Sequence, residues 1–319
     1  MTSYASRRRE LQTRLEQFNS QAVYPLLAEL GSRHTTGPLL PMGFDPSKPY
    51  HRLTTAMVPS VAVSNRDLAP FGPKAHKNFR VIPEAWRQHS DMMRFMAGEM
   101  LRGRTNFTLI TNHSNIIDIA LVAGALRLEI ERWLSALEFT QRTALVISRG
   151  ITTTQLYIRE DEFFMPAVEA IQMFANVALS FPTTPTVRNK KFPDDLVRTS
   201  NELTKLELAE FLEPGGRLLA IAPSASRDIF YSERIHMQPL KAGTMQLMRG
   251  WVIPVAVNLD GDEPPACTIL GPTFIETDDD CHAVMHEIAH ECHRQTLVPH
   301  TYHEKPHALE RALDRLRRD

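Results

Sequence analysis

From Asn106 onward the sequence alternates short β-rich runs with helical stretches, and this alternation constrains the fold more than any other feature. The β-rich runs cover residues 107–111, 143–148, 176–181, 217–222, 252–257 and 267–270. The helical stretches lie near residues 115–138, 166–175, 196–213 and 238–249, and Gly215-Gly216 marks the end of the third. Strands that alternate with helices form a sheet covered by helices. We therefore expect an α/β fold with a mixed, mostly parallel sheet.

The first ninety residues have a different character. Apolar residues recur at helical spacing between residues 7 and 30, and a second helical stretch covers residues 84–102. Between them, prolines and glycines interrupt the pattern, as is typical of loops and short helices. We expect a smaller helical N-terminal region over residues 1–90, followed by an α/β domain over residues 91–319.

Composition excludes several classes of protein. The 36 Lys and Arg residues balance 37 Asp and Glu residues, which argues against a nucleic-acid partner. Three cysteines (Cys267, Cys281 and Cys292) without a C-x-x-C favour a reducing compartment. No apolar stretch follows the arginines at 7–9, and the uncharged run 170–187 is too polar for a membrane span. We expect a soluble, cytoplasmic protein, with peripheral membrane contact left open.

The first apolar strand delivers a histidine to its carboxyl end, where α/β folds bind their ligands. Residues 108–118 read T-L-I-T-N-H-S-N-I-I-D. Asn115 is a good N-cap for the next helix, and Asp118 follows in its first turn. From the preceding turn, His113 can meet the Asp118 carboxylate, which would leave the other ring nitrogen free as a base for a hydroxyl. The alternative is a strand-end histidine that only hydrogen-bonds to a helix cap.

A second apolar strand ends in a turn that carries an arginine. Residues 217–228 read R-L-L-A-I-A-P-S-A-S-R-D. A guanidinium at this edge of the sheet can bind a phosphate through two hydrogen bonds, so Arg227 is a candidate phosphate ligand. The alternative is a structural ion pair between Arg227 and Asp228 on the surface.

Together these segments resemble the soluble plastid-type branch of the glycerol-3-phosphate acyltransferases, within the H-x4-D glycerolipid acyltransferase superfamily. Asn112-His113-x4-Asp118 is similar to the N-H-x4-D motif of that family. Residues 221–228 are similar to its I-A-P-S-G-G-R-D stretch, and residues 252–257 are similar to a later apolar strand that contains a proline. The resemblance covers roughly residues 84–300 and implies an acyltransferase-like fold after a helical N-terminal region.

The resemblance also implies an activity. It is the transfer of a fatty acyl group from an acyl thioester, acyl-ACP or acyl-CoA, to the sn-1 hydroxyl of glycerol 3-phosphate, a step in phospholipid synthesis. His113 would deprotonate the hydroxyl and Asp118 would orient the ring. The implied partners are acyl carrier protein or a coenzyme A thioester, together with glycerol 3-phosphate, and no cofactor is required. An acyltransferase of the same fold with a different hydroxyl or amine acceptor is the alternative.

Two departures from the family concern the phosphate site. The family has a second arginine two residues after the first, where this chain has Ile229. It also has a Ser-Lys-Lys-His stretch after the third strand, where this chain reads Phe181-Pro-Thr-Thr. Three other basic residues are candidates to complete a phosphate pocket with Arg227: Arg149, Lys190 and Lys191.

Other patterns indicate different chemistry. His286-Glu287-Ile-Ala-His290 is a literal H-E-x-x-H, which on a helix can bind zinc, with Glu287 as general base and Glu310 as a third ligand. The surrounding segment is rich in histidine, which favours a chance match, and we expect no metal site. A zinc metalloprotease that uses His286, Glu287 and His290 is a distant alternative. Ser224 at a strand end lacks the G-x-S-x-G elbow of serine hydrolases, and no glycine-rich nucleotide-binding loop occurs. A non-catalytic lipid-binding or interaction module is the remaining alternative.

Overall fold

The structure, a computed structural model, describes residues 82, 85–114, 118–148, 176–180, 194–225, 227–259 and 266–316, together with residues 6, 9, 10 and 13. Most of the expected helical region over residues 1–90 lies outside these residues. The expected helix over 166–175 also lies outside them, as do three of the candidate cations, Arg149, Lys190 and Lys191.

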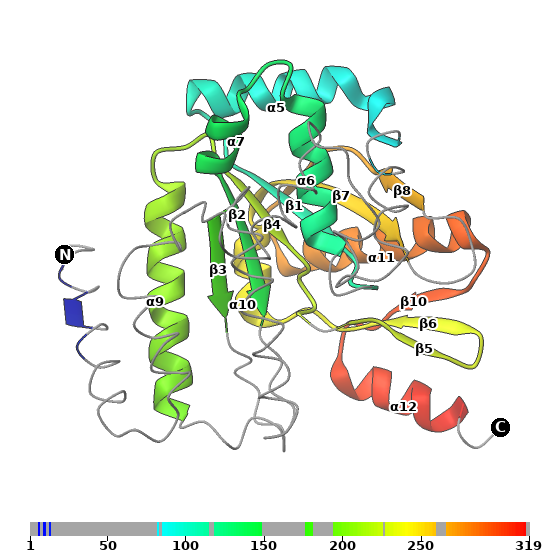
Figure 1. Cartoon of the computed structure of the whole chain (residues 1–319). Coiled ribbons are helices and arrows are strands. Elements are labelled where there is room, and N and C mark those ends of the chain that lie inside the picture. The colour runs from blue at the N-terminus through cyan, green and yellow to red at the C-terminus, as the bar shows by residue number, and fades with distance from the viewer. Residues whose placement is uncertain are drawn as a thin grey trace, which may run out of the picture.

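Within the described residues, the centre of the fold is a seven-stranded sheet with the order β3-β2-β4-β1-β7-β8, and β9 pairs with β7 (Figure 1). The strands are β1 (Phe107–Thr111), β2 (Thr143–Ser148), β3 (Asn176–Ser180), β4 (Leu218–Ile221), β7 (Gly250–Asn258), β8 (Ala266–Ile269) and β9 (Thr273–Ile275). The first five in the sheet order are parallel, whereas β8 and β9 run antiparallel to β7. The α/β class and the mixed, mostly parallel sheet are therefore confirmed.

Helices cover both faces of this sheet. They are α5 (Ser90–Arg102), α6 (Asp118–Ile130), α7 (Ala136–Arg142), α9 (Asp194–Leu212) and α11 (Asp278–Thr296). Three shorter helices accompany them: the 3-10 helices η2 (Arg87–His89) and η4 (Gln246–Met248), and α10 (Ala242–Met245). Successive strand residues point to opposite faces. Leu109 packs in the cluster formed with α5 and α6, and its neighbour Ile110 packs in the cluster formed with α11. None of the described helices is long and apolar enough to cross a bilayer.

Two helical predictions are corrected in detail. The stretch expected as one helix over 115–138 contains two helices, because Ser135 starts α7 with a capping box in which it and Glu138 exchange hydrogen bonds. The stretch expected as a helix over 238–249 holds only α10 and η4. By contrast, α9 lies close to its expected range of 196–213.

A second, three-stranded sheet follows the turn after β4 and was not predicted. It contains β5 (Ile229–Tyr231), β6 (Arg234–Met237) and β10 (His300–Tyr302), and α12 (Pro306–Leu316) follows it. These strands are too short to show a clear alternation. The hairpin turn between β5 and β6 also lacks its usual signal, because Ser232 and Glu233 have φ of 51° and 59°, where Asn-Gly is preferred.

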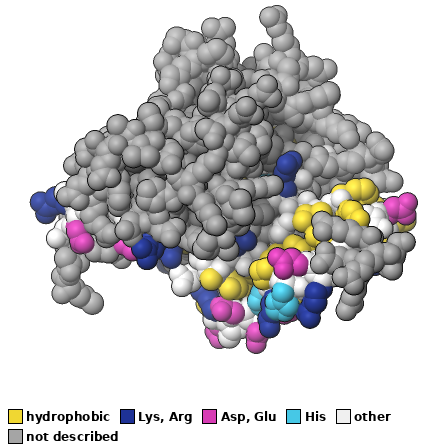
Figure 2. All heavy atoms as spheres, turned by 90° about the horizontal axis from the view of Figure 1, so that it is seen from below, with side chains coloured by type: hydrophobic (Ala, Val, Ile, Leu, Met, Phe, Trp, Pro, Cys, Tyr) yellow, Lys and Arg dark blue, Asp and Glu magenta, His cyan; other side chains and the backbone are white. Residues whose placement is uncertain are grey.

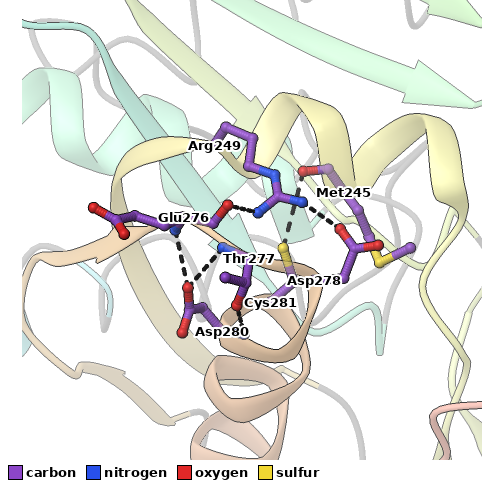
Figure 3. A network of polar contacts seen from close by, with 7 residues as sticks. All are labelled: Met245, Arg249, Glu276, Thr277, Asp278, Asp280 and Cys281. Carbon is purple, nitrogen blue, oxygen red and sulfur yellow. Dashed lines mark hydrogen bonds and ion pairs between the residues drawn. The ribbon is translucent and has the colours of Figure 1, made fainter.

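The N-terminus of α11 is fixed to the start of β7 by a polar network (Figure 3). Thr277 and Asp280 form a capping box. Arg249, directly before β7, donates to the Glu276 carbonyl oxygen and forms an ion pair with Asp278. The network therefore sets where the apolar side of α11 packs against the sheet.

The glycine pair at 215–216 does more than end α9, as its contacts show. Both residues have positive φ, 72° and 63°. A Cβ atom on Gly216 would lie 2.2 Å from the carbonyl oxygen of Met100, and one on Gly215 would lie 2.3 Å from that of Gly103. The turn that leads into β4 therefore packs, backbone against backbone, on the end of α5.

We expect Gly216→Ala to lower the free energy of unfolding by about 2–4 kcal/mol, because it adds left-handed strain and a clash with backbone atoms. Gly243→Ala is the matched control, since a Cβ there would meet nothing within 4 Å and the residue lies in a helix. Urea unfolding of the two variants and the parent measures the difference. Equal stability of both variants would contradict this account of the turn.

Candidate functional site

Strand pairing brings two turns to one edge of the sheet. β1 and β4 are parallel neighbours with Ile110 opposite Ile221, so their carboxyl ends lie side by side. His113 follows β1, and Asp228 belongs to the turn that follows β4. The backbone N–H of Asp228 donates to the His113 carbonyl oxygen at 2.7 Å. The two segments singled out in the sequence are therefore joined directly.

His113 and Asp118 form a hydrogen-bonded pair. The His113 Nδ1 atom lies 3.2 Å from Oδ1 and 3.5 Å from Oδ2 of Asp118. Asp118 is fully buried at the start of α6, and its Oδ1 also accepts the backbone N–H of Ile119 at 2.8 Å. The His113 side chain is 18% exposed. Its Nε2 atom has no hydrogen-bond partner among the described residues. A carboxylate thus holds one ring nitrogen, and no described residue holds the other.

The charges around His113 make its ring a stronger base. Burial by itself lowers the pKa of His113, but the hydrogen bond and charge of Asp118 and the charge of Asp228 outweigh this effect. The Arg227 guanidinium opposes the two carboxylates. The pKa of His113 is therefore raised above its ordinary value of 6.5.

Asn112 fixes the end of β1. Its Nδ2 donates to the Val257 carbonyl oxygen at 2.8 Å, and its Oδ1 accepts the Val257 N–H at 2.8 Å. These buried bonds continue the pairing of β1 with β7 beyond Thr111, so the next residue, His113, leaves the sheet from a rigid anchor. The motif around Asn112 does not indicate this role, because its partner Val257 lies 145 residues away in the sequence.

Asp228 is a half-buried acid whose Oδ2 atom is buried, and it is not a surface partner of Arg227. No ion pair joins these two residues in the described part of the chain, and Oδ2 of Asp228 is buried without a hydrogen-bond partner there. Burial raises the pKa of Asp228 to about 7, although the charge of His113 and hydrogen bonds from Asn112 and the Gln238 backbone lower it. The alternative of a surface ion pair between Arg227 and Asp228 is therefore wrong. Because an arginine precedes Asp228, nothing in the sequence indicated that its carboxyl oxygen is buried.

Arg227 is exposed at the same edge, and its charge acts on His113. Its carbonyl oxygen accepts a hydrogen bond from Gln238 at 3.3 Å, which holds its backbone. Of the four candidate phosphate ligands, it is the one that the described residues contain. Ile229, at the position of the family's second arginine, begins β5 opposite His236.

The turn between β4 and β5 offers no accessible nucleophile in Ser224. That residue is 3% exposed, so its hydroxyl group could not reach a substrate in this arrangement. The next residue, Ala225, has a φ of 53° and donates its N–H to the Ala222 carbonyl oxygen at 2.9 Å. Glycine would suit this left-handed conformation better, and glycine stands there in the I-A-P-S-G-G-R-D stretch.

The H-E-x-x-H segment lies on the solvent side of α11. His286, Glu287 and His290 are all exposed, and Glu310 is exposed on α12. His286 Nε2 pairs with Glu304 at 3.2 Å. In the described part of the chain no group of three or more His, Cys, Asp or Glu residues could hold a metal ion. On the face seen in Figure 2, acidic, basic and histidine side chains lie among hydrophobic ones over the described residues.

We expect Glu287→Gln to leave every activity of the protein unchanged, because Glu287 faces solvent and touches no metal site. Treatment with a strong chelator should be equally silent, and elemental analysis should find no stoichiometric zinc. A zinc ion retained through purification, with peptidase activity that Glu287→Gln abolishes, would contradict this assignment.

No protein-family model matches this chain, and no curated protein is significantly similar to it in sequence. The chemistry of the site therefore has to be inferred from its own groups. These are an imidazole paired with a buried carboxylate, a second, half-buried carboxyl group and an exposed guanidinium, all at one edge of a parallel sheet.

Proposed function

We propose that this protein is a glycerol-3-phosphate 1-O-acyltransferase-like enzyme with an acyltransferase-like fold. It moves a fatty acyl group from acyl carrier protein or coenzyme A to the sn-1 hydroxyl of glycerol 3-phosphate and so makes 1-acyl-glycerol 3-phosphate for phospholipid synthesis. The observation that carries the proposal is the His113–Asp118 pair, with Nδ1 held and Nε2 available beside an exposed arginine. The three free, buried cysteines support a reducing, cytoplasmic compartment.

The proposed reaction is a single displacement. His113 Nε2 accepts the proton of the acceptor hydroxyl as its oxygen attacks the thioester carbonyl carbon. The tetrahedral intermediate then collapses, the carbon–sulfur bond breaks, and the leaving thiolate takes the proton from the imidazolium. Asp118 stabilises the imidazolium and keeps the ring in one tautomer. No covalent acyl-enzyme and no cofactor takes part.

Arg227 supports an acceptor that carries an anionic group. Its guanidinium is exposed and close enough to His113 for its charge to act on the ring. A phosphate bound by Arg227 would therefore place the rest of a small acceptor near the base. One cation is few for a dianion, and Arg149, Lys190 and Lys191 remain the proposed additional ligands.

A second candidate differs only in the acceptor. Ile229 occupies the position of the family's second arginine and forms a backbone pair in the small sheet, so this position supplies no charge to the site. That observation favours an acyltransferase of the same fold that acts on another hydroxyl or on an amine. A panel of acceptors with one labelled acyl thioester separates the two candidates.

We expect His113→Ala to reduce acyl transfer by about 10²–10⁴-fold, because it removes the general base. Asp118→Asn should cost less if the carboxylate only orients the ring, and as much if its charge also stabilises the imidazolium. His286→Ala, an exposed histidine on α11, is the matched control and should retain full activity. Steady-state rates with labelled thioester measure all three. Wild-type turnover by His113→Ala would refute the mechanism.

We expect Arg227→Ala to raise the KM for glycerol 3-phosphate by about 10- to 100-fold, which corresponds to the loss of a hydrogen bond to a charged group. The kcat should fall less, because the lost interaction is made in the ground state as well as the transition state. Arg234→Ala removes another exposed arginine, on β6, and should leave KM unchanged. If glycerol is acylated as well as its phosphate ester, and Arg227→Ala changes neither reaction, the phosphate site is wrongly assigned.

A further inference from the structure

We propose that Asp228 is a positioning residue for His113, which supports the imidazole from the turn after β4 while Asp118 supports it from α6. This inference rests on the proposed role of His113 as the base. It assigns to the site a second carboxyl group, one that the sequence suggested would face solvent.

The backbone of Asp228 is tied to that of His113. Its N–H donates to the His113 carbonyl oxygen at 2.7 Å, which joins the turn after β4 to the end of β1. Asn112, the residue before His113, is fixed by two bonds to Val257. Interactions with the Asn112 side chain and the Gln238 backbone lower the pKa of the Asp228 carboxyl group, so that group lies close to both.

The described residues do not fully satisfy the Asp228 carboxyl group. Oδ2 is buried and has no hydrogen-bond partner among the described residues. An unsatisfied buried oxygen costs stability and calls for an explanation in function. A negative charge kept beside a ring that becomes positive during the reaction supplies that explanation.

His113 and Asp228 also act on each other through their charges. The charge of Asp228 raises the pKa of His113, and the charge of His113 lowers the pKa of Asp228. The other groups that act on this pair are Asp118 from α6, Arg227 from the same turn and the buried thiol of Cys292 from α11. Protonation of His113 therefore favours the ionised form of Asp228, and the ionised form stabilises the imidazolium.

The direction of the pH effect follows from these signs. His113 acts as a base only when it is unprotonated, so kcat/KM should rise as the pH increases through the pKa of His113 and then level off. Asp228→Asn keeps the size of the side chain but removes the charge that raises this pKa. The acid limb of the profile should therefore move to lower pH, while the plateau falls because the imidazolium is less well stabilised.

The test is an NMR titration of protein with labelled histidine rings, in which the His113 signal is identified by its absence in His113→Ala. We expect the His113 midpoint to move to lower pH in Asp228→Asn, and the acid limb of kcat/KM to move with it. Glu291→Gln is the matched control, since it removes a buried carboxylate from α11 that pairs with Arg294 and does not act on His113. That variant should leave both readouts unchanged.

An unchanged His113 midpoint in folded Asp228→Asn would overturn the inference. If that variant does not fold, a carbonyl-labelled aspartate titration of the wild type decides instead. Asp228 should titrate near pH 7 and shift to higher pH in His113→Ala, and an ordinary carboxyl midpoint near pH 4 would overturn the inference. A protein that shows the coupling but transfers no acyl group would refute only the proposed function.

Discussion

The pairing of β1 with β4 on one side and with β7 on the other is the constraint on which the site depends. It sets the carboxyl ends of parallel strands at one edge, where the two polar turns meet. Asn112 extends that pairing past the last strand residue, and the N–H of Asp228 closes the link between the turns. The position of His113 is therefore fixed by strand pairing, by the Asn112 side chain and by the backbone bond from Asp228.

The site keeps its charges in an unequal arrangement. Two carboxyl groups and one guanidinium act on the imidazole; Asp118 and the Oδ2 atom of Asp228 are buried, whereas Arg227 is exposed. Such an arrangement favours a ring that gains a proton while it faces an anionic ligand. Ser224 in the turn after β4 is buried, so it is not an accessible nucleophile in this arrangement. The geometry thus suits transfer by direct attack of a bound hydroxyl.

The sequence predicted the central sheet well because its strands carry a strong local signal. All six expected strands are present, and β1 and β2 have the expected limits. The small sheet was missed because its strands are three or four residues long and its hairpin turn has Ser232 and Glu233 where glycine is usual. Local sequence patterns do not indicate strands this short or a hairpin turn without glycine.

The site was predicted only where its contacts are local. His113 and Asp118 are five residues apart, so their pairing followed from a strand, a turn and a helix start. The electrostatic surroundings of Asp228 include Asn112 and Cys292, which lie far away in the sequence. The bond of Asn112 to Val257 spans 145 residues. Such contacts follow from the order of strands in the sheet, which local sequence patterns do not predict.

The most direct test of the central claim is product analysis after incubation of the wild-type protein with glycerol 3-phosphate and a labelled acyl thioester. Mass spectrometry should find a monoacyl product with the ester on the sn-1 oxygen, formed in step with free thiol. Hydrolysis of the thioester without ester formation on any acceptor would contradict the account, because it would leave His113 without the hydroxyl substrate that the mechanism requires.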